Sequence, residues 1–189
     1  VYGDTEINVS KITFDSREVE NNALFIAISG HNYDGHDYIS QSTKNGASVV
    51  VCENLPTNFK ESNIVFICVK CSKTALSIIA SNFFDNPSSK IDLIGITGTN
   101  GKTTISSLLN NLFNELKVKS GLISTINIKY GEYTENSNNT TPDPITINSH
   151  LSKMIKRKIK VCFIEVSSHG IFQKRVQGIK FKGMVFTNL

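Results

Sequence analysis

The sequence predicts an α/β protein with mainly parallel sheets that is divided into two domains, and three observations support this prediction. Short apolar runs recur along the chain and are separated by segments of helical periodicity. The run at 91–96 leads into a glycine-rich turn and then an amphipathic segment, which is the order of strand, loop and helix in mononucleotide-binding domains. The polar stretch at 85–90 contains a proline and two adjacent serines, which is typical of a linker. We therefore expect two domains, residues 1–88 and residues 89–189.

The first domain is expected to alternate strands with helices. Runs rich in β-branched and aromatic residues predict strands, and apolar residues at helical spacing predict helices. The expected strands lie at 11–14, 24–28, 47–52 and 64–69, and the expected helices at 37–45 and 72–84.

The second domain is expected to begin with a strand at 91–96 and a helix at 103–116. Six side chains of this helix are predicted to form one apolar stripe: Ile105, Leu108, Leu109, Leu112, Phe113 and Leu116. Apolar runs predict a buried strand at 161–165 and a further apolar strand at 183–186. The segment at 129–139 has neither helical nor strand periodicity and is expected to be irregular.

The glycine-rich turn is the most informative motif of the chain. Its backbone N–H groups can close around a phosphate, while Lys102 brings a positive charge to the phosphate oxygens. The Thr103 hydroxyl can reach a Mg²⁺ ion, and the following helix adds the positive end of its dipole. The usual spacing would place a glycine where this chain has Ile96, so the strict pattern is not met. We predict a mononucleotide phosphate site formed by Gly98, Thr99, Asn100, Gly101, Lys102, Thr103 and Thr104.

A second part of this site is predicted at the end of the strand at 161–165. Glu165 ends a buried strand, which is how a further Mg²⁺ ligand is delivered beside a phosphate loop. A carboxylate in this position is also commonly a solvated residue or a helix cap. Because the phosphate loop lies upstream, we predict that Thr103 and Glu165 bind the metal and that Lys102 and Glu165 are the catalytic residues.

Together these motifs resemble those of the Mur ligases, in the same order over essentially the whole chain. The resemblance rests on Gly-Thr-Asn-Gly-Lys-Thr-Thr at 98–104, Asn-Thr-Thr-Pro-Asp at 139–143, Glu-Val-Ser-Ser-His-Gly at 165–170 and Phe-Thr-Asn-Leu at 186–189, and upstream on Phe-Asp-Ser-Arg at 14–17 and Gly-His-Asn-Tyr-Asp-Gly-His at 30–36. It implies a small N-terminal α/β domain that binds a UDP-sugar, followed by a truncated P-loop domain with a mainly parallel sheet.

The resemblance also implies two sets of substrate contacts. The uridine side would be lined by Phe14, Ser16, His31, Asn32 and Tyr33. The muramoyl-peptide would be contacted by Asn139, Thr140, Thr141, Ser167, Gln173 and Arg175. Arg175 is the expected anion clamp, because a guanidinium group can hold a carboxylate or phosphate through two parallel hydrogen bonds. Without the resemblance, these residues would be interpreted as turns and surface groups.

The implied activity is that of an ATP-dependent amide ligase in peptidoglycan precursor synthesis. Its cofactors would be ATP and Mg²⁺, and its partners UDP-N-acetylmuramoyl-dipeptide and a diamino acid, either diaminopimelate or lysine. The reaction would pass through an acyl phosphate. Since the family has a third domain that binds the amino acid, we expect these 189 residues to be a fragment without ligase turnover on its own.

Three alternative functions are considered. They are another ligase of the same family, a folylpolyglutamate synthetase, which shares the phosphate-loop motif, and a nucleotide-operated switch. The Asp-Ser-Arg element at 15–17 argues against the folate enzyme, which has no comparable UDP-sugar domain. The chain has no Asn-Lys-x-Asp element, which would support a guanine-nucleotide switch.

Composition indicates a soluble chain, and we expect a cytoplasmic monomer that binds neither membranes nor nucleic acid. No apolar run is long enough to span a bilayer, and the net charge of +4 suits anionic substrates. The basic run at 153–160 lacks interleaved aromatic residues and is expected to be a solvated helix end. The four cysteines, including Cys68 and Cys71 at C-x-x-C spacing, are expected to be reduced thiols.

Overall fold

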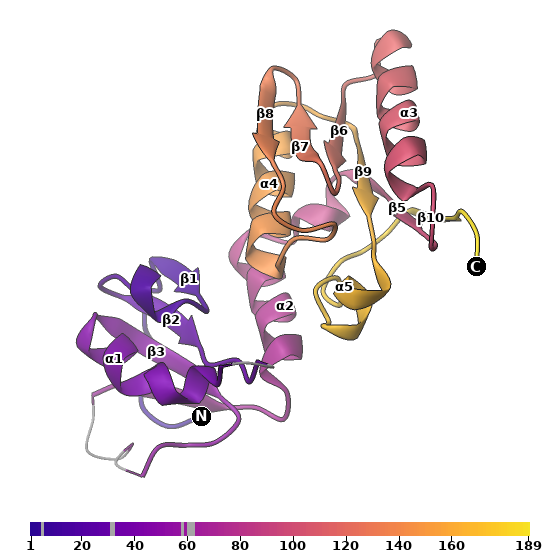
Figure 1. The fold of residues 1–189 in the computed structure, drawn as a ribbon. Coiled ribbons are helices and arrows are strands. Elements are labelled where there is room, and N and C mark those ends of the chain that lie inside the picture. Colours follow the sequence, from indigo (N-terminus) through magenta and orange to yellow (C-terminus); the bar gives the residue numbers. More distant parts are fainter. Residues whose placement is uncertain (5, 31–32, 58, 60–62) are drawn as a thin grey trace. The chain divides into compact units, whose positions relative to one another are not determined.

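The computed structural model describes residues 1–4, 6–30, 33–57, 59 and 63–189 of the chain. It comprises two compact units, Val1–Leu76 and Ser77–Leu189, each built on its own sheet (Figure 1). The chain passes from one unit to the other within α2 (Ser72–Phe83), ahead of the polar stretch that the sequence suggests as a linker. The predicted fold class, α/β with mainly parallel sheets, is confirmed.

The first unit has a four-stranded parallel sheet in the order β1-β2-β3-β4. Its strands are β1 (Lys11–Thr13), β2 (Ala23–Ile26), β3 (Ala47–Cys52) and β4 (Val65–Cys68), and its short helices are η1 (Ser16–Glu18), η2 (Gly35–Tyr38) and α1 (Ile39–Lys44). Phe25 and Val50 of the central strands are buried with Ile39 and Phe66 in one core. The strands predicted for this part of the chain are confirmed to within two residues at each end.

The second unit has a six-stranded sheet in the order β10-β5-β9-β6-β7-β8. Its strands are β5 (Asp92–Thr97), β6 (Ser120–Ile123), β7 (Asn127–Tyr130), β8 (Tyr133–Asn136), β9 (Val161–Glu165) and β10 (Gly183–Phe186). The first four strands in the sheet order pair in parallel, and β7 and β8 add an antiparallel hairpin. The helices are η4 (Pro87–Ser89), α3 (Lys102–Glu115), α4 (Pro144–Lys156) and α5 (Ser168–Phe172).

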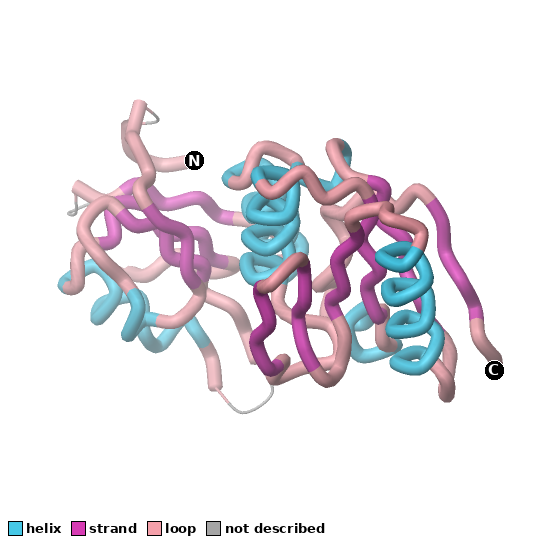
Figure 2. The backbone as a smooth tube through the Cα atoms, turned by 90° about the horizontal axis from the view of Figure 1, so that it is seen from above, coloured by secondary structure: helices cyan, strands magenta, loops and turns pink. Residues whose placement is uncertain are grey.

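Helices α3 and α4 cover opposite faces of this sheet, as Figures 1 and 2 show. Neighbouring side chains of a strand point to opposite faces, so β9 contributes to two cores. Phe163 packs with Ile96 and Leu122 on the α3 side, whereas Cys162 and Ile164 belong to the core that includes α4. The central strands β6 and β9 are therefore buried on both sides, which explains the continuous apolar run of β9.

The predicted six-residue stripe on α3 is only half correct. Ile105, Leu109 and Phe113 pack against the sheet. Leu108, Leu112 and Leu116 are 62%, 53% and 64% exposed. A helix lying on a sheet contacts it through a narrow row of side chains four residues apart, and the neighbouring row points away.

The expectation of an irregular segment at 129–139 is wrong. The segment contains part of β7 and all of β8, which form an antiparallel hairpin with Tyr130 paired to Tyr133. Gly131 has a φ of 57° and supplies the left-handed turn between the strands. The alternation of β7 begins at Asn127, before this segment, and Tyr133 is the one apolar residue of β8, so the segment itself shows no clear alternation.

No helix in the described part of the chain is long and apolar enough to cross a membrane. Cys52, Cys68, Cys71 and Cys162 are all free thiols, as predicted. Burial raises the pKa of Cys52 to about 11, so that this thiol is protonated and serves as a small apolar side chain.

Candidate functional site

The candidate site of the second unit lies where its parallel strands end. The crossover from β5 to β6 uses α3, while the chain after β9 returns to β10 on the other side of β5. The connections thus diverge between β5 and β9, and ligands of open α/β sheets bind at such a point, outside the carboxyl ends of the strands. The glycine-rich loop follows β5, and Glu165 is the last residue of β9.

The loop after β5 requires glycine at two positions. Gly98 has a φ of 130° and Gly101 a φ of 81°. A Cβ at Gly98 would collide with the Thr187 hydroxyl and lie 2.9 Å from the Asn188 carbonyl oxygen. Gly101 is the N-cap of α3 and has no side chain to cap it, so the first N–H groups of the helix face the loop without a side-chain acceptor from this residue.

The side chain of Lys102 folds back over this loop. Its Nζ donates to the carbonyl oxygens of Gly98 at 2.7 Å and Thr99 at 3.1 Å. The loop therefore places an ammonium group next to the backbone N–H groups at the start of α3. Both kinds of donor suit the oxygens of a phosphate group, and the phosphate site at this loop stays a prediction.

Two residues after β10 hold the loop in place. Thr187 Oγ1 and Asn188 Nδ2 donate to the carbonyl oxygen of Asn100 at 2.6 Å and 3.1 Å, and Asn188 Oδ1 accepts from the Asn100 N–H at 3.0 Å. In the sequence, this segment is part of the family resemblance but has no predicted role of its own. Its position directly after an apolar strand was the signal that it lies at the same sheet edge as the loop.

Glu165 is completely buried and is neither a solvated residue nor a helix cap. Its Oε2 accepts from Thr103 Oγ1 at 3.0 Å and from Thr125 Oγ1 at 2.8 Å. Its Oε1 accepts from Ser106 Oγ at 3.3 Å and from the Thr125 N–H at 3.2 Å. The structure thus brings Thr103 and Glu165 together, as predicted, and adds Ser106 and Thr125, which the sequence analysis missed.

The surroundings of Glu165 fit a divalent cation. All four of its donors are neutral, and none of the ion pairs in the described residues involves this carboxylate. The described residues also contain no cluster of three or more His, Cys, Asp or Glu side chains that could hold a metal. A Mg²⁺ ion here would therefore take one carboxylate and one hydroxyl from the protein and its other ligands from phosphate and water, which is its usual preference beside nucleotides.

The segment at 139–143 is attached to the same strand. Thr141 Oγ1 donates to the Glu165 carbonyl oxygen at 2.9 Å and accepts from the Ser167 N–H at 2.9 Å. The hydroxyl group of Thr125 lies 3.1 Å from Thr140 Oγ1, within hydrogen-bond distance. Asn139 is exposed. Four predicted substrate or metal residues, Thr140, Thr141, Glu165 and Ser167, therefore share one hydrogen-bond network.

Arg175 and Gln173 also join this network. Arg175 donates from Nη1 to the Thr141 carbonyl oxygen, and from Nε and Nη2 to Gln173 Oε1 at 2.9 Å and 2.7 Å. Three of the five guanidinium N–H groups are thus used to position the side chain, and two are left for a ligand. The role of Arg175 as an anion clamp stays a prediction.

The residues predicted to contact uridine lie in the first unit. Phe14 and Tyr33 are exposed and Ser16 is buried, while His31 and Asn32 lie outside the described residues. Asp15 lies between Phe14 and Ser16 in the sequence. The Arg17 guanidinium group donates a hydrogen bond to its carboxylate and holds the pKa of Asp15 below its usual value. Exposed aromatic side chains next to a buried hydroxyl can contact a base and ribose, but their role as uridine contacts stays a prediction.

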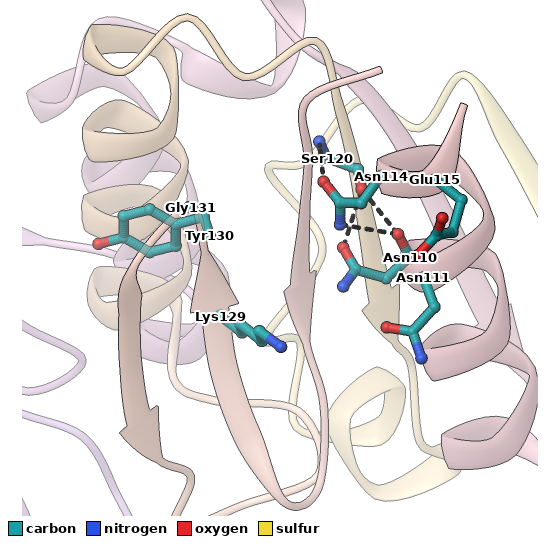
Figure 3. A pocket seen from close by; sticks show the side chains of 8 residues that line it. All are labelled: Asn110, Asn111, Asn114, Glu115, Ser120, Lys129, Tyr130 and Gly131. Atoms are coloured by element: carbon teal, nitrogen blue, oxygen red, sulfur yellow. Dashed lines mark hydrogen bonds between the residues drawn. The ribbon is translucent and has the colours of Figure 1, made fainter. Parts of the chain in front are cut away.

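A pocket of about 360 Å³ lies elsewhere in the second unit (Figure 3). Its lining residues are Asn110, Asn111, Asn114, Glu115, Ser120, Lys129, Tyr130 and Gly131. They come from the C-terminal part of α3, the start of β6, the end of β7 and the turn after β7. Because the phosphate loop precedes α3, the pocket lies at the other end of that helix and shares no residue with the candidate site.

Comparison with protein families agrees with this arrangement. The family model for the Mur ligase middle domain matches residues 96–189, and the model for the Mur ligase family, catalytic domain, matches residues 8–87. The chain belongs to the Mur ligase family. The middle-domain match includes every residue of the candidate site from the phosphate loop to Asn188.

Curated members of the Mur ligase family align with the chain over its entire length. The UDP-N-acetylmuramoyl-L-alanyl-D-glutamate--2,6-diaminopimelate ligase of Cytophaga hutchinsonii is 46% identical over 189 residues, and that of Phocaeicola vulgatus is 44% identical over 189 residues. The match covers 100% of this chain in both cases. The chain spans 39% of the length of these relatives.

Solved structures of Mur ligases share the fold. A structure of UDP-N-acetylmuramoyl-L-alanyl-D-glutamate--2,6-diaminopimelate ligase superposes with a TM-score of 0.77 and 24% identity, over 96% of this chain and 36% of that one. The MurF ligase of Thermotoga maritima in complex with ADP superposes with a TM-score of 0.62 and 21% identity, over 94% of this chain and 37% of that one. At these identities the superpositions support the architecture of both units.

Proposed function

We propose that this chain provides the nucleotide-sugar-binding and ATP-binding parts of a ligase. The proposed reaction adds a diamino acid to UDP-N-acetylmuramoyl-L-alanyl-D-glutamate in peptidoglycan precursor synthesis. The names of the relatives at 44–46% identity support the substrate, and they favour 2,6-diaminopimelate over lysine as the diamino acid. The observation that carries the proposal is the contact between Thr103 and Glu165 beside the phosphate loop, because it joins a nucleotide site to a metal site.

The proposed chemistry has two steps. The γ-phosphoryl group of ATP passes to the free side-chain carboxylate of the D-glutamyl residue, which releases ADP and forms an acyl phosphate. The neutral amino group of the diamino acid then attacks the acyl carbon, the C–O bond to phosphate breaks, and the amine loses a proton. The products are an amide and inorganic phosphate.

The residues of this chain would act through position and charge. Lys102 and the N–H groups at the start of α3 would stabilise the negative charge on the phosphoryl group as it moves. Thr103 and Glu165 would hold Mg²⁺, which supplies further positive charge at the phosphate oxygens when it is bound. Thr140, Thr141, Ser167 and Arg175 would orient the acceptor carboxylate, since their network contacts the strand that carries Glu165. No residue of the chain needs to act as a covalent nucleophile.

The remaining parts of the proposal follow from the same assignment. The substrate domain would comprise residues 1–88, with Phe14, Ser16, His31, Asn32 and Tyr33 on the uridine side, and the ATP-binding domain residues 89–189. A water-soluble UDP-sugar substrate and the use of ATP favour a cytoplasmic enzyme, and we propose that it is a monomer that contacts neither membrane nor nucleic acid.

The test is a ligase assay on the complete protein that carries this chain. With ATP, Mg²⁺, UDP-N-acetylmuramoyl-L-alanyl-D-glutamate and diaminopimelate, the proposal predicts ADP, phosphate and the tripeptide product in equal amounts. Lysine in place of diaminopimelate should give little product. Formation of a glutamylated folate, or ATP hydrolysis that does not depend on the UDP-sugar, would contradict the proposal.

A further inference from the structure

Thr125 lies between the two halves of the candidate site. It follows β6 and is exposed, yet both its backbone N–H and its hydroxyl contact the buried carboxylate of Glu165, at 3.2 Å and 2.8 Å. The same hydroxyl lies 3.1 Å from Thr140 Oγ1. Thr125 is thus in contact with a predicted metal ligand on one side and a predicted substrate contact on the other.

The hydroxyl of Thr125 has two acceptors within reach but only one proton. Glu165 Oε2 is nearer than Thr140 Oγ1 and carries negative charge, so it is the stronger acceptor. The hydroxyl group of Thr125 therefore donates its proton preferentially to Glu165. The Thr140 hydroxyl donates to no acceptor among the described residues, so its own orientation is not fixed.

A cation bound to Glu165 changes this balance. The carboxylate lone pairs that accept from hydroxyl groups are then drawn to the metal, and Glu165 becomes a weaker acceptor for Thr125. The hydroxyl proton of Thr125 can turn to Thr140 Oγ1, which lies within hydrogen-bond distance already. Thr140 would then accept from Thr125 and direct its own proton away from it, towards the acceptor substrate.

We infer that Thr125 is a positioning residue that couples the two halves of the site, because its hydroxyl group keeps its proton but turns its hydrogen bond from Glu165 to Thr140 when Mg²⁺ and nucleotide bind. This inference rests on the proposed function, which assigns the metal to Glu165 and the acceptor substrate to Thr140. The coupling increases the affinity for UDP-N-acetylmuramoyl-dipeptide once Mg²⁺ and nucleotide are in place.

The test compares Thr125→Val with Thr125→Ser in the complete protein that carries this chain. Valine keeps the shape and the backbone N–H but removes the hydroxyl, whereas serine restores it. Thr134→Val is the matched control, because Thr134 is an exposed residue of β8 outside the site. Calorimetry measures the affinity for UDP-N-acetylmuramoyl-L-alanyl-D-glutamate with and without Mg²⁺ and a non-hydrolysable ATP analogue.

The wild type, Thr125→Ser and Thr134→Val are expected to bind the UDP-sugar at least about fivefold more tightly when Mg²⁺ and the analogue are present, which is the lower end of typical coupling between sites. Thr125→Val should bind both ligands but show no such gain. An equal gain in Thr125→Val, or loss of both ligands in both Thr125 variants, would overturn the inference. A wild type that binds neither ligand would instead contradict the proposed function itself.

Discussion

The hydroxyl of Thr103 donates a hydrogen bond to the carboxylate of Glu165 at 3.0 Å, although 62 positions separate the two residues in the chain. The contact exists because β5 and β9 are adjacent parallel strands whose carboxyl ends lie at one edge of the sheet. The phosphate loop leaves that edge from β5, and Glu165 ends β9. The fold thus places a hydroxyl and a buried carboxylate beside the loop that would hold a nucleotide.

The first prediction concerns the charge of Glu165. In Glu165→Gln, the amide oxygen can face the Thr125 N–H, and the amide NH₂ can donate to the hydroxyl groups that now donate to Oε2, because hydroxyl groups both accept and donate. The fold should therefore persist. Loss of the negative charge should raise the Mg²⁺ concentration needed for half-maximal ATP binding at least about tenfold, which corresponds to about 1.4 kcal/mol.

Calorimetric titration of ATP at a series of Mg²⁺ concentrations measures this effect. Glu115→Gln is the matched control, since Glu115 is exposed at the far end of α3 and should leave the Mg²⁺ dependence unchanged. An unchanged dependence in Glu165→Gln would make Glu165 a structural residue.

The second prediction concerns the backbone of the phosphate loop. Gly98→Ala places an alanine at a backbone φ of 130°, which is strained for any residue with a side chain, and brings its Cβ against Thr187 and Asn188. The substitution should therefore lower the free energy of unfolding by about 1–3 kcal/mol or more. Gly131→Ala is the control, because Gly131 has a φ of 57° but no heavy atom within 4 Å of an added Cβ. Urea unfolding measures the free energy of unfolding of both variants. Equal losses of this free energy would show that the contacts with Thr187 and Asn188 do not constrain the loop.

The third prediction concerns the pH dependence of stability. Burial lowers the pKa of His150 below its usual 6.5, against an opposing contribution from Glu135, whose Oε1 lies 2.8 Å from Nε2 of the histidine. Lys153 also lowers this pKa, and Asp143 raises it. The unfolded state therefore binds the proton first, so the full contribution of His150 to stability is present above about pH 6.5 and is lost as the pH falls through the folded-state pKa.

Urea unfolding of the wild type and of His150→Gln between pH 7.5 and 5 checks this prediction, with pH values chosen to span the ordinary histidine pKa of about 6.5. Glutamine keeps hydrogen-bonding groups but does not titrate in this range. The difference in unfolding free energy between the two proteins should change in favour of the variant as the pH falls. A difference that is constant with pH would show that His150 does not titrate between the folded and unfolded states.

Much of the fold and part of the site were predictable from the sequence. The order of strand, glycine loop and helix at 91–116 and the acid at the end of β9 are local signals, and in a parallel sheet they imply the contact between Thr103 and Glu165. The hairpin of β7 and β8 was not predicted, because β7 is only four residues long and β8 has one apolar residue, Tyr133, so no sustained alternation is visible. The exposed row of Leu108, Leu112 and Leu116 was wrongly placed, because periodicity does not show which of two adjacent helical rows meets the sheet.

The roles of Ser106, Thr125, Thr187 and Asn188 were missed for a different reason. Hydroxyl and amide side chains are common in turns, so their type and spacing carry little information about a site. What places them is the convergence of β6, β9 and β10 with α3 in space, which depends on the strand order. The only available signal was that Thr125 and Thr187 each follow an apolar strand within two residues.

The most direct test of the account is the turnover of Lys102→Ala, because Lys102 is the one cation that contacts the phosphate loop in the described residues. Phosphate release is measured in the complete protein that carries this chain, with Lys129→Ala as a control for loss of an exposed lysine on β7. The account predicts a fall in turnover of at least about a hundredfold for Lys102→Ala, the scale of losing one electrostatic stabiliser of a transition state, with little change in UDP-sugar affinity. Turnover of Lys102→Ala close to that of the wild type and of Lys129→Ala would contradict it.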